Sequence, residues 1–170
     1  MNYIKIKEND VANGEGITVS LWVSGCPHHC KGCFQPETWD YNAGQEFSQD
    51  TAKYILELLD KNGIKRNLSI LGGEPLCPEN IDMVWLLCRY IKQKRPETII
   101  YIWTGYQYEY LLKNYTEELF RYVDYLIDGK FEEDKKDLSL KLRGSYNQRV
   151  IDIKETLEND CIVEKYKYSI

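Results

Sequence analysis

The hydrophobic positions of this chain change their period along its length, from two residues to three or four and back again. In residues 17–24 the apolar side chains Ile17, Val19, Leu21 and Val23 alternate onto one face, which predicts a β-strand. Further strands are predicted over residues 67–73, 98–105 and 122–129. Between them, apolar residues at helical spacing predict helices over residues 48–62, 79–94 and about 107–121.

Strands that alternate with helices indicate parallel βαβ units joined by right-handed crossovers. A complete eight-unit barrel takes roughly 250 residues, whereas this chain has 170. About four or five units fit, so we expect an α/β fold with parallel strands and outer helices, arranged as an open sheet or a partial barrel. The pattern weakens after Lys130, where the residues are charged and irregular. Because there is no repeat and no linker, residues 1–170 are expected to form a single domain.

Composition and charge narrow the class of protein. Hydrophobic residues make up 43% of the chain and charged residues 29%, which indicates a folded core rather than disorder. The formal net charge of −5 gives no overall positive field, so no nucleic-acid partner is expected. No segment approaches the roughly 20 consecutive apolar residues of a membrane span, and the first residues are charged, unlike an export signal. We therefore expect a cytoplasmic protein with no membrane partner.

The stretch GCPHHCKGCF, residues 25–34, carries the clearest candidate chemistry. Its three cysteines, Cys26, Cys30 and Cys33, directly follow the first predicted strand. They therefore lie at the edge of the sheet where parallel α/β proteins place their ligands. In a reducing compartment such a cluster is suited to metal binding or redox chemistry rather than to disulfides.

Three kinds of site are compatible with these thiols. A structural zinc site needs a fourth ligand, which His28 or His29 can supply, but four ligands in so short a loop leave little chain to wrap a tetrahedron. A redox pair of Cys30 and Cys33 forms a CxxC and leaves Cys26 without a role. A four-iron cluster held by three thiolates keeps an open coordination site on one iron, and open sites on metals are where chemistry occurs.

The spacing of the cysteines, followed by the aromatic Phe34, resembles the signature of the radical S-adenosylmethionine (SAM) superfamily. In that superfamily the open iron chelates SAM, and one electron from a [4Fe-4S] cluster cleaves it to methionine and a 5′-deoxyadenosyl radical. The resemblance implies that Cys26, Cys30 and Cys33 hold the cluster. It also implies that SAM is bound by Gly32, Cys33 and Phe34.

The superfamily also has a glycine-rich turn after the second strand, and LGGEP stands there. Gly72 and Gly73 permit close backbone approach, and Glu74 can accept a hydrogen bond from the SAM ammonium group. By itself GGEP is equally compatible with an ordinary turn into a helix.

Three further candidate residues lie at the ends of later predicted strands. The hydroxyl of Thr104 is expected to contact the cofactor or to cap the next helix. Asp128 and Lys130, in the segment IDGK, resemble a feature of activating enzymes, a salt-bridged pair that touches the methionine portion of SAM. A surface ion pair is the alternative for these two residues.

The other histidines and cysteines have plainer interpretations. His28 and His29 are expected to be exposed loop positions. Cys77 lies near the cluster or serves packing, and Cys88, on the apolar face of a predicted helix, belongs to the core. The sequence assigns no role to Cys161.

Longer stretches narrow the resemblance to one family. The segments VANGEGITVSLWVSGCPHHC, LSILGGEPLCPEN, YIWTGY and DYLIDGKFEEDKKDLSLKLRGSYNQRVID are similar, in this order, to the activating proteins of anaerobic ribonucleoside-triphosphate reductase. Members of that family often carry Asp where this chain has Glu74, and RGSSNQ where it has RGSYNQ. The similarity runs from about residue 2 to about residue 153. The residues from about 154 onward have no clear counterpart in the family.

The resemblance implies an oxidoreductase that removes a hydrogen from one glycine Cα of the reductase and leaves a glycyl radical. Its cofactors would be a [4Fe-4S] cluster and SAM, and its partners the reductase and a one-electron donor such as flavodoxin. No side chain would be catalytic beyond the cluster and SAM, because the cofactors carry the chemistry. The RGSYNQ segment is expected either to dock the reductase or to form a structural turn.

Two other functions stay open at this point. One is a radical SAM enzyme that acts on another glycyl radical enzyme or on a small molecule. The other is a non-catalytic metal-binding module. A partial barrel leaves a wide lateral opening, which favours a protein substrate.

Overall fold

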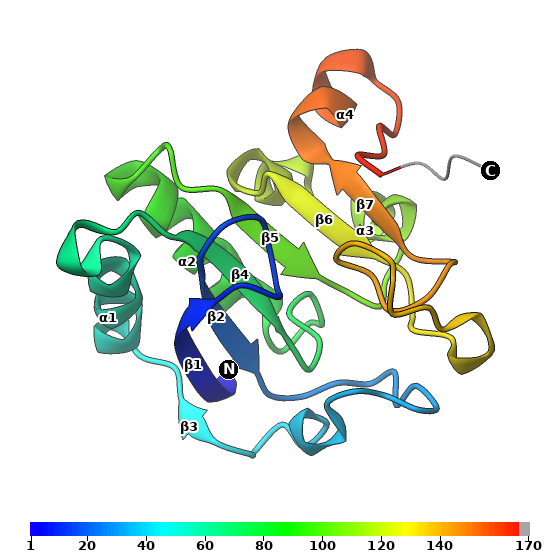
Figure 1. The fold of residues 1–170 in the computed structure, drawn as a ribbon, viewed down its shortest axis with the longest axis horizontal. Coiled ribbons are helices and arrows are strands. Elements are labelled where there is room, and N and C mark those ends of the chain that lie inside the picture. The colour runs from blue at the N-terminus through cyan, green and yellow to red at the C-terminus, as the bar shows by residue number, and fades with distance from the viewer. Residues whose placement is uncertain (167–170) are drawn as a thin grey trace.

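The computed structural model describes residues 1–166, which contain a seven-stranded sheet (Figure 1). The strands are β1 (Asn2–Asp10), β2 (Thr18–Val23), β3 (Gln45–Glu46), β4 (Asn67–Gly72), β5 (Ile100–Trp103), β6 (Tyr125–Asp128) and β7 (Arg149–Asp152). The helices are α1 (Gln49–Leu59), α2 (Ile81–Lys94), α3 (Tyr108–Asn114) and α4 (Ile153–Asn159). Short 3₁₀ helices cover Pro36–Thr38, Lys61–Gly63, Glu117–Tyr122 and Glu133–Lys135.

The middle of the sheet is parallel and follows chain order. The strands are arranged β3-β1-β2-β4-β5-β6-β7, and β2, β4, β5 and β6 run parallel to one another. Strand β1 is antiparallel to β2, and β7 is antiparallel to β6, so the sheet stays open at both sides. Within residues 1–166, the four parallel strands β2, β4, β5 and β6 are connected in turn by α1, α2 and α3. The predicted α/β class with parallel central strands is confirmed.

Helices α1, α2 and α3 begin within two residues of the predicted positions, but α1 ends at Leu59, before the predicted residue 62. The side chain of Ser48 accepts a hydrogen bond from the backbone N–H of Thr51, and the hydroxyl of Thr51 accepts one from the N–H of Ser48, so a capping box starts α1. The helix predicted over residues 107–121 is divided into α3 and the 3₁₀ segment Glu117–Tyr122. No helix within residues 1–166 is both long and apolar enough to cross a membrane.

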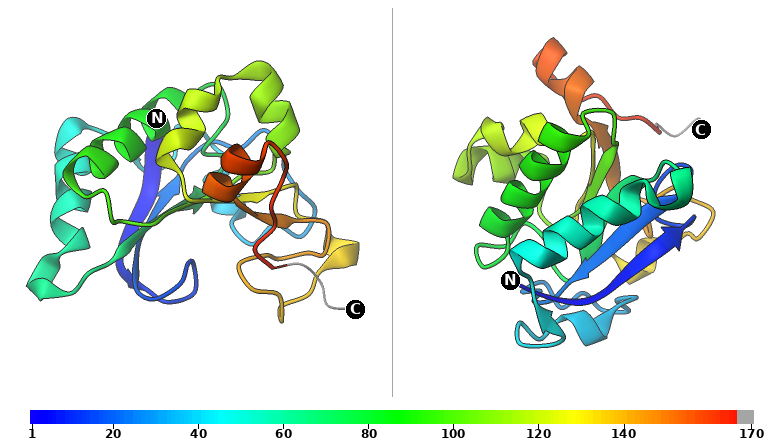
Figure 2. Two further views of the ribbon diagram at one scale, coloured as in Figure 1. Left: turned by 90° about the horizontal axis from the view of Figure 1, so that it is seen from above. Right: turned by 90° about the vertical axis from the view of Figure 1, so that its left-hand side faces the viewer.

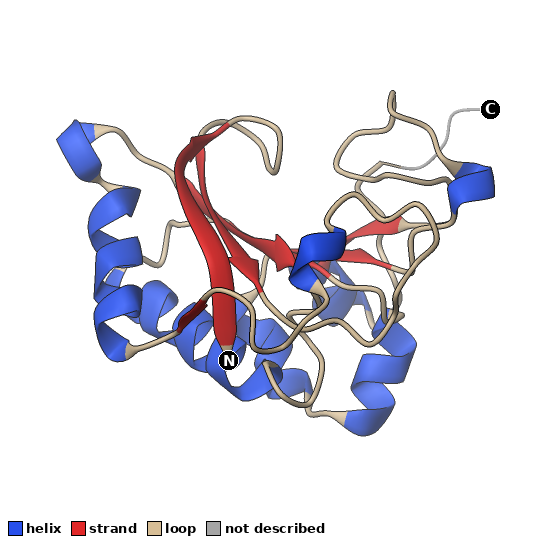
Figure 3. Ribbon diagram, turned by 90° about the horizontal axis from the view of Figure 1, so that it is seen from below, coloured by secondary structure: helices blue, strands red, loops and turns tan. Residues whose placement is uncertain are grey.

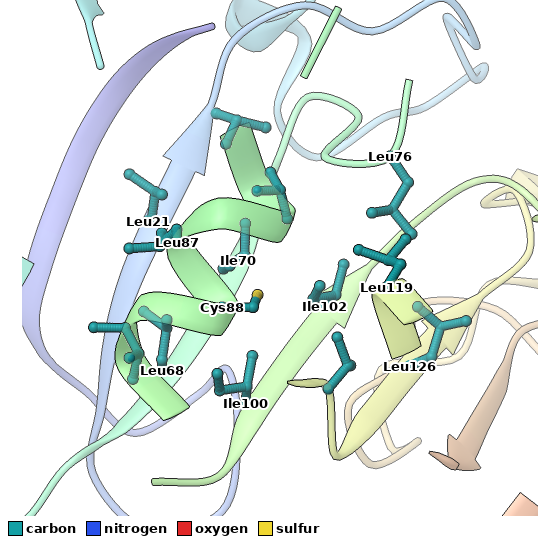
Figure 4. Packing of buried hydrophobic residues seen from close by; sticks show 14 of the residues in the cluster. Leu21, Leu68, Ile70, Leu76, Leu87, Cys88, Ile100, Ile102, Leu119 and Leu126 are labelled. Atoms are coloured by element: carbon teal, nitrogen blue, oxygen red, sulfur yellow. The ribbon is translucent and has the colours of Figure 1, made fainter. Parts of the chain in front are cut away.

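One face of the sheet packs against the helices and forms the main core. The side chains of Val19, Leu21 and Val23, predicted to share a face, are completely buried in this core. Figure 3 shows α1, α2 and α3 on that side of the strands. In Figure 4, Leu87 and Cys88 of α2 lie over the strand residues of the same core, so the prediction that Cys88 is a core residue is confirmed.

The opposite face of the sheet carries polar and aromatic side chains and is covered by loops. A Cβ atom placed on Gly14 would lie within 3.2 Å of Thr18, Ser69 and Tyr101, so the loop after β1 runs across this face. Its start is held by Asp10, whose buried carboxylate accepts hydrogen bonds from Lys7, Ala12, Asn13 and Ser20. This face of the sheet, which the helices do not cover, is therefore an inner face that lies beneath the loops.

The hydrophobic pattern missed three strands, β1, β3 and β7. Strand β1 mixes isoleucine with lysine, and along it half-buried and exposed residues alternate. Strand β7 follows a charged, irregular segment and is only four residues long. Antiparallel strands with one solvated face carry a weaker hydrophobic signal than buried parallel strands, which explains these omissions.

Candidate functional site

A cavity of about 340 Å³ lies where the carboxyl ends of the parallel strands meet the loops. Its wall includes residues of the cysteine loop, the turn at residues 72–74, the end of β5 and the segment 129–148. In Figure 1 and the left view of Figure 2, the cysteine loop and the segment 130–148 lie at the same end of the molecule. The site is thus assembled from segments more than 100 residues apart in sequence.

The structure brings the three predicted thiols together in this wall. Cys26 is buried, Cys30 and Cys33 are half-buried, and all three are free thiols. The backbone N–H of Cys33 donates to the carbonyl oxygen of Cys30 at 3.1 Å, which closes a turn between them. The N–H of Gln35 lies 3.4 Å from the sulfur of Cys33.

Burial sets the protonation of two of these thiols. It raises the pKa of Cys26 to about 11, although the backbone amides of His28 and His29 act in the opposite direction. Burial, followed by the nearby Cys33, also raises the pKa of Cys30, which the amide of Phe131 partly offsets. Burial therefore disfavours the thiolate of Cys30, one member of the possible redox pair. A metal centre binds thiolates by displacing their protons, and amides directed at the sulfurs stabilise such ligands.

Both histidines of the loop, the possible fourth ligands of a zinc site, have other partners in the structure. Within residues 1–166, no three His, Cys, Asp or Glu side chains lie close enough together to hold one metal ion. His28 is engaged by Glu74, and His29 stacks on Trp39 with ring centroids 4.6 Å apart. Three thiols spread over one wall suit a cluster, in which each thiolate binds its own iron.

Glu74 is fully buried in the same wall. Among the described residues its carboxylate has four hydrogen-bond partners. Oε1 accepts from the N–H of Leu76 at 2.9 Å and from the hydroxyl of Thr104 at 2.7 Å. Oε2 accepts from the N–H of Gly105 and from Nε2 of His28, both at 2.7 Å. A carboxylate offers about four acceptor positions, so this side chain ties three loops together.

Comparisons with known proteins agree with this geometry. A family model described as a 4Fe-4S single cluster domain matches residues 12–151. The anaerobic ribonucleoside-triphosphate reductase-activating protein of Pasteurella multocida (strain Pm70) is 40% identical over 150 residues, covering 87% of this chain and 95% of its own length. The proteins of the same name from Escherichia coli (strain K12) and Enterobacteria phage T4 are also 40% identical, over 88% of this chain and over 97% and 93% of their own lengths.

The chain belongs to the anaerobic ribonucleoside-triphosphate reductase-activating protein family. The resemblance predicted from the sequence is therefore confirmed. The match to the 4Fe-4S domain includes every segment of the cavity wall, from Ala12 to Gln148. It also supports an iron–sulfur cofactor for this chain.

One prediction at this site is wrong, and one of two alternatives is excluded. The expectation that His28 is an exposed loop position is wrong, because its side chain is only 6% exposed and its ring lies against Gly105. Thr104 does not cap α3, whose N-cap residue is Gln107. Its hydroxyl instead donates to Glu74 and accepts from the N–H of Tyr106. His29 is exposed, as predicted.

The glycines of the GGEP turn are needed for close approach of the chain to itself. A Cβ on Gly73 would lie 2.4 Å from the carbonyl oxygen of Gly25, at the start of the cysteine loop. The N–H of Glu74 donates to that same oxygen at 2.7 Å. The turn after β4 therefore lies directly against the cysteine loop, and any side chain at Gly73 would push the two apart.

Asp128 has a structural partner that the sequence did not indicate. Its carboxylate is 1% exposed and accepts from Nε of Arg149 at 2.9 Å, with a second contact from Nη2. It also accepts from the N–H of Tyr108 at 2.8 Å, at the start of α3. Lys130 is exposed, so the expected Asp128–Lys130 ion pair is not the one formed. Asp128, and then Glu109, raise the pKa of Arg149 well above its usual range.

The RGSYNQ segment forms a structural turn beside the cavity. The side chain of Gln148 accepts from the N–H groups of Gly144 and Ser145 and donates to the carbonyl oxygen of Gly129. A Cβ on Gly144 would lie 2.9 Å from the ring of Phe34, so this turn packs against the aromatic residue of the cysteine loop. The turn interpretation is confirmed, and docking of the reductase stays a prediction.

The remaining cysteines do not line the cavity, and several aromatic residues of its wall were not predicted. Cys77 is buried beside Tyr41, and burial raises the pKa of its thiol to about 12. Cys161 is exposed. The unpredicted wall residues include Trp22, Trp39, Trp103 and Phe131. Trp22 and Trp103 lie out of phase with the core residues of β2 and β5, which is the signal that places them on the inner face.

Proposed function

We propose that this protein cleaves SAM reductively and uses the resulting radical to form a glycyl radical on an anaerobic ribonucleoside-triphosphate reductase. The observation that carries the proposal is the convergence of Cys26, Cys30 and Cys33 with the turn at residues 72–74 on one cavity. The names of relatives at 40% identity and the 4Fe-4S domain support it.

The three cysteines are the proposed ligands of the cluster. A cluster held by these residues would supply the electron that cleaves SAM to methionine and a 5′-deoxyadenosyl radical, which would take a hydrogen atom from a glycine Cα. The residues proposed to contact SAM are Gly32, Cys33, Phe34, Gly72, Gly73, Glu74, Thr104, Asp128 and Lys130. Six of them line the cavity, whereas Gly32, Asp128 and Lys130 do not belong to its wall. The chain's own contribution is to position the groups and exclude water.

We further propose that residues 1–170 form a single domain with a partial, open (β/α) barrel of the radical SAM type. Its parallel strands follow chain order, its helices cover one face and its cavity lies on the other side. The open sheet leaves lateral access for a loop of the reductase. A one-electron donor such as flavodoxin and a cytoplasmic location complete the proposal.

The test is SAM cleavage by anaerobically reconstituted protein. With SAM and a strong one-electron reductant, the wild type should form 5′-deoxyadenosine, and Cys30→Ala should not. Cys88→Ala is the matched control, because this cysteine is buried in the helix-packed core. With an anaerobic ribonucleoside-triphosphate reductase added, electron paramagnetic resonance should detect a glycyl radical.

Three outcomes would contradict the proposal. Zinc in place of iron would leave a metal-binding module. Cleavage of SAM in which a small molecule rather than the reductase is changed would indicate a different radical enzyme. An intact cluster with no 5′-deoxyadenosine, even with the reductase present, would contradict the activating reaction itself.

A further inference from the structure

His28 lies midway between the first two cysteines of the loop, yet its ring is turned into the protein. Its side chain is 6% exposed, and Nε2 lies 2.7 Å from Oε2 of Glu74. Oε1 accepts from the N–H of Leu76 and Oε2 from the N–H of Gly105, so both carboxylate oxygens act as acceptors and Nε2 of His28 is assigned as the donor. The contact joins residues that are 46 positions apart in the sequence.

Glu74 is a fixed point to which the loop is attached. Its other three partners are the N–H group of Leu76, in its own turn after β4, and the hydroxyl of Thr104 and the N–H group of Gly105, directly after β5. The ring of His28 is also confined from the sides. It contacts Tyr106 edge-on with centroids 4.6 Å apart, and a Cβ on Gly105 would lie 2.4 Å from it.

We propose that His28 is a positioning residue for the [4Fe-4S] cluster, which holds the cysteine loop to Glu74 so that Cys26, Cys30 and Cys33 stay arranged around one cluster. Cys26 and Cys30 flank the anchored residue by two positions on either side, so release of His28 frees the backbone between two ligands. Side chains that orient metal ligands from outside the metal's own shell typically change metal affinity about 10- to 100-fold when they are removed. The inference rests on the proposed function for the cluster ligands and not on SAM cleavage.

The experiment measures cluster loss from anaerobically reconstituted protein in excess EDTA, followed by visible absorbance and by iron and sulfide content. His28→Leu removes the donor while keeping an apolar side chain, and it should lose the cluster at least about tenfold faster than the wild type. His28→Gln can place an amide N–H where Nε2 stands, so it should restore most of the retention. His29→Gln is the matched control, because this neighbouring histidine is exposed and should change retention little.

A second route leaves the histidine in place. Gly105→Ala should push the ring away from Glu74 and reproduce the rapid loss seen for His28→Leu, which keeps the test valid where His28→Leu does not fold. Retention equal to wild type in both variants would overturn the proposal. Failure of His28→Gln to rescue would overturn it too, because packing of the ring rather than the hydrogen bond would then hold the loop. Formation of 5′-deoxyadenosine, measured in parallel on samples of equal iron content, separates this outcome from failure of the proposed function.

Discussion

Replacement of Arg149 by methionine tests how the carboxyl end of β6 is held. Arg149→Met keeps most of the length of the side chain and removes the charge that pairs with Asp128. Asp128, which is 1% exposed, would then keep the N–H of Tyr108 as a hydrogen-bond donor. The variant therefore leaves a buried carboxylate with much less compensation for its lost hydration.

The loss of folding stability expected for Arg149→Met follows from the burial of Asp128 and Arg149. Removal of one partner of a buried pair costs roughly 3–5 kcal/mol. The guanidinium side is 23% exposed, so water can reach part of the pair, and we expect about 2–3 kcal/mol at pH 7. The contact of Arg149 with Glu109, which is 55% exposed, adds less than about 1 kcal/mol.

The assay is urea unfolding of cluster-free protein, kept anaerobic and reduced so that metal loss does not obscure the transition. At about 2 kcal/mol per molar urea, the midpoint should fall by about 1–1.5 M. Lys130→Met is the control and should change stability by less than about 0.5 kcal/mol, since Lys130 is exposed. An Arg149→Met protein as stable as the wild type, or a Lys130→Met protein as unstable as Arg149→Met, would refute the reasoning.

Three further changes have defined outcomes. Glu74→Gln, nearly isosteric, presents an amide N–H to donors and should speed cluster loss as His28→Leu does; unchanged retention would contradict this. Gly73→Ala places a Cβ 2.4 Å from the carbonyl oxygen of Gly25 and should lower the thermal midpoint and the iron content together, which calorimetry and iron analysis can check. Burial by itself raises the pKa of Asp10, but hydrogen bonds from its neighbours outweigh it and leave the pKa lowered. The stability from Asp10 is therefore present above the unfolded-state pKa, about 3.9, and lost as pH falls through the folded value. Asp10→Asn should be less stable at pH 7 by urea unfolding and lose less stability than the wild type between about pH 5 and pH 3; an equal acid dependence would contradict it.

The central fold could be predicted because its signal is local. Strands β2, β4, β5 and β6 are buried on the helix-packed face, and the helices between them carry caps and apolar stripes that any short window reveals. Strands β1 and β7 pair antiparallel at the flanks and mix apolar with charged residues. Their place in the sheet depends on pairing with a neighbour, which hydrophobic periodicity does not encode.

At the site, too, the local features could be predicted from the sequence, and the contacts between distant segments could not. The three cysteines lie within eight positions, so their spacing is sufficient to indicate a metal-binding loop. The partner of Asp128 is 21 positions away and the partner of His28 is 46 positions away. From residue type and spacing, Lys130 was the expected partner of Asp128, and His28 was expected to be exposed to solvent. Only the sheet order brings Arg149 and Glu74 to those side chains.

The contacts of Glu74 in the folded chain change what can be inferred about its role in SAM binding. From the sequence, a carboxylate after two glycines is free to accept a hydrogen bond from the ammonium group of SAM. In the folded chain, its acceptor positions are taken by two backbone N–H groups, Thr104 and His28. Leu76 lies in the turn after β4, and Thr104 and Gly105 directly follow β5, whereas His28 lies on the cysteine loop. An ammonium group that bound Oε2 would therefore have to replace His28, and SAM binding at that atom would be coupled directly to the loop that carries the cluster ligands.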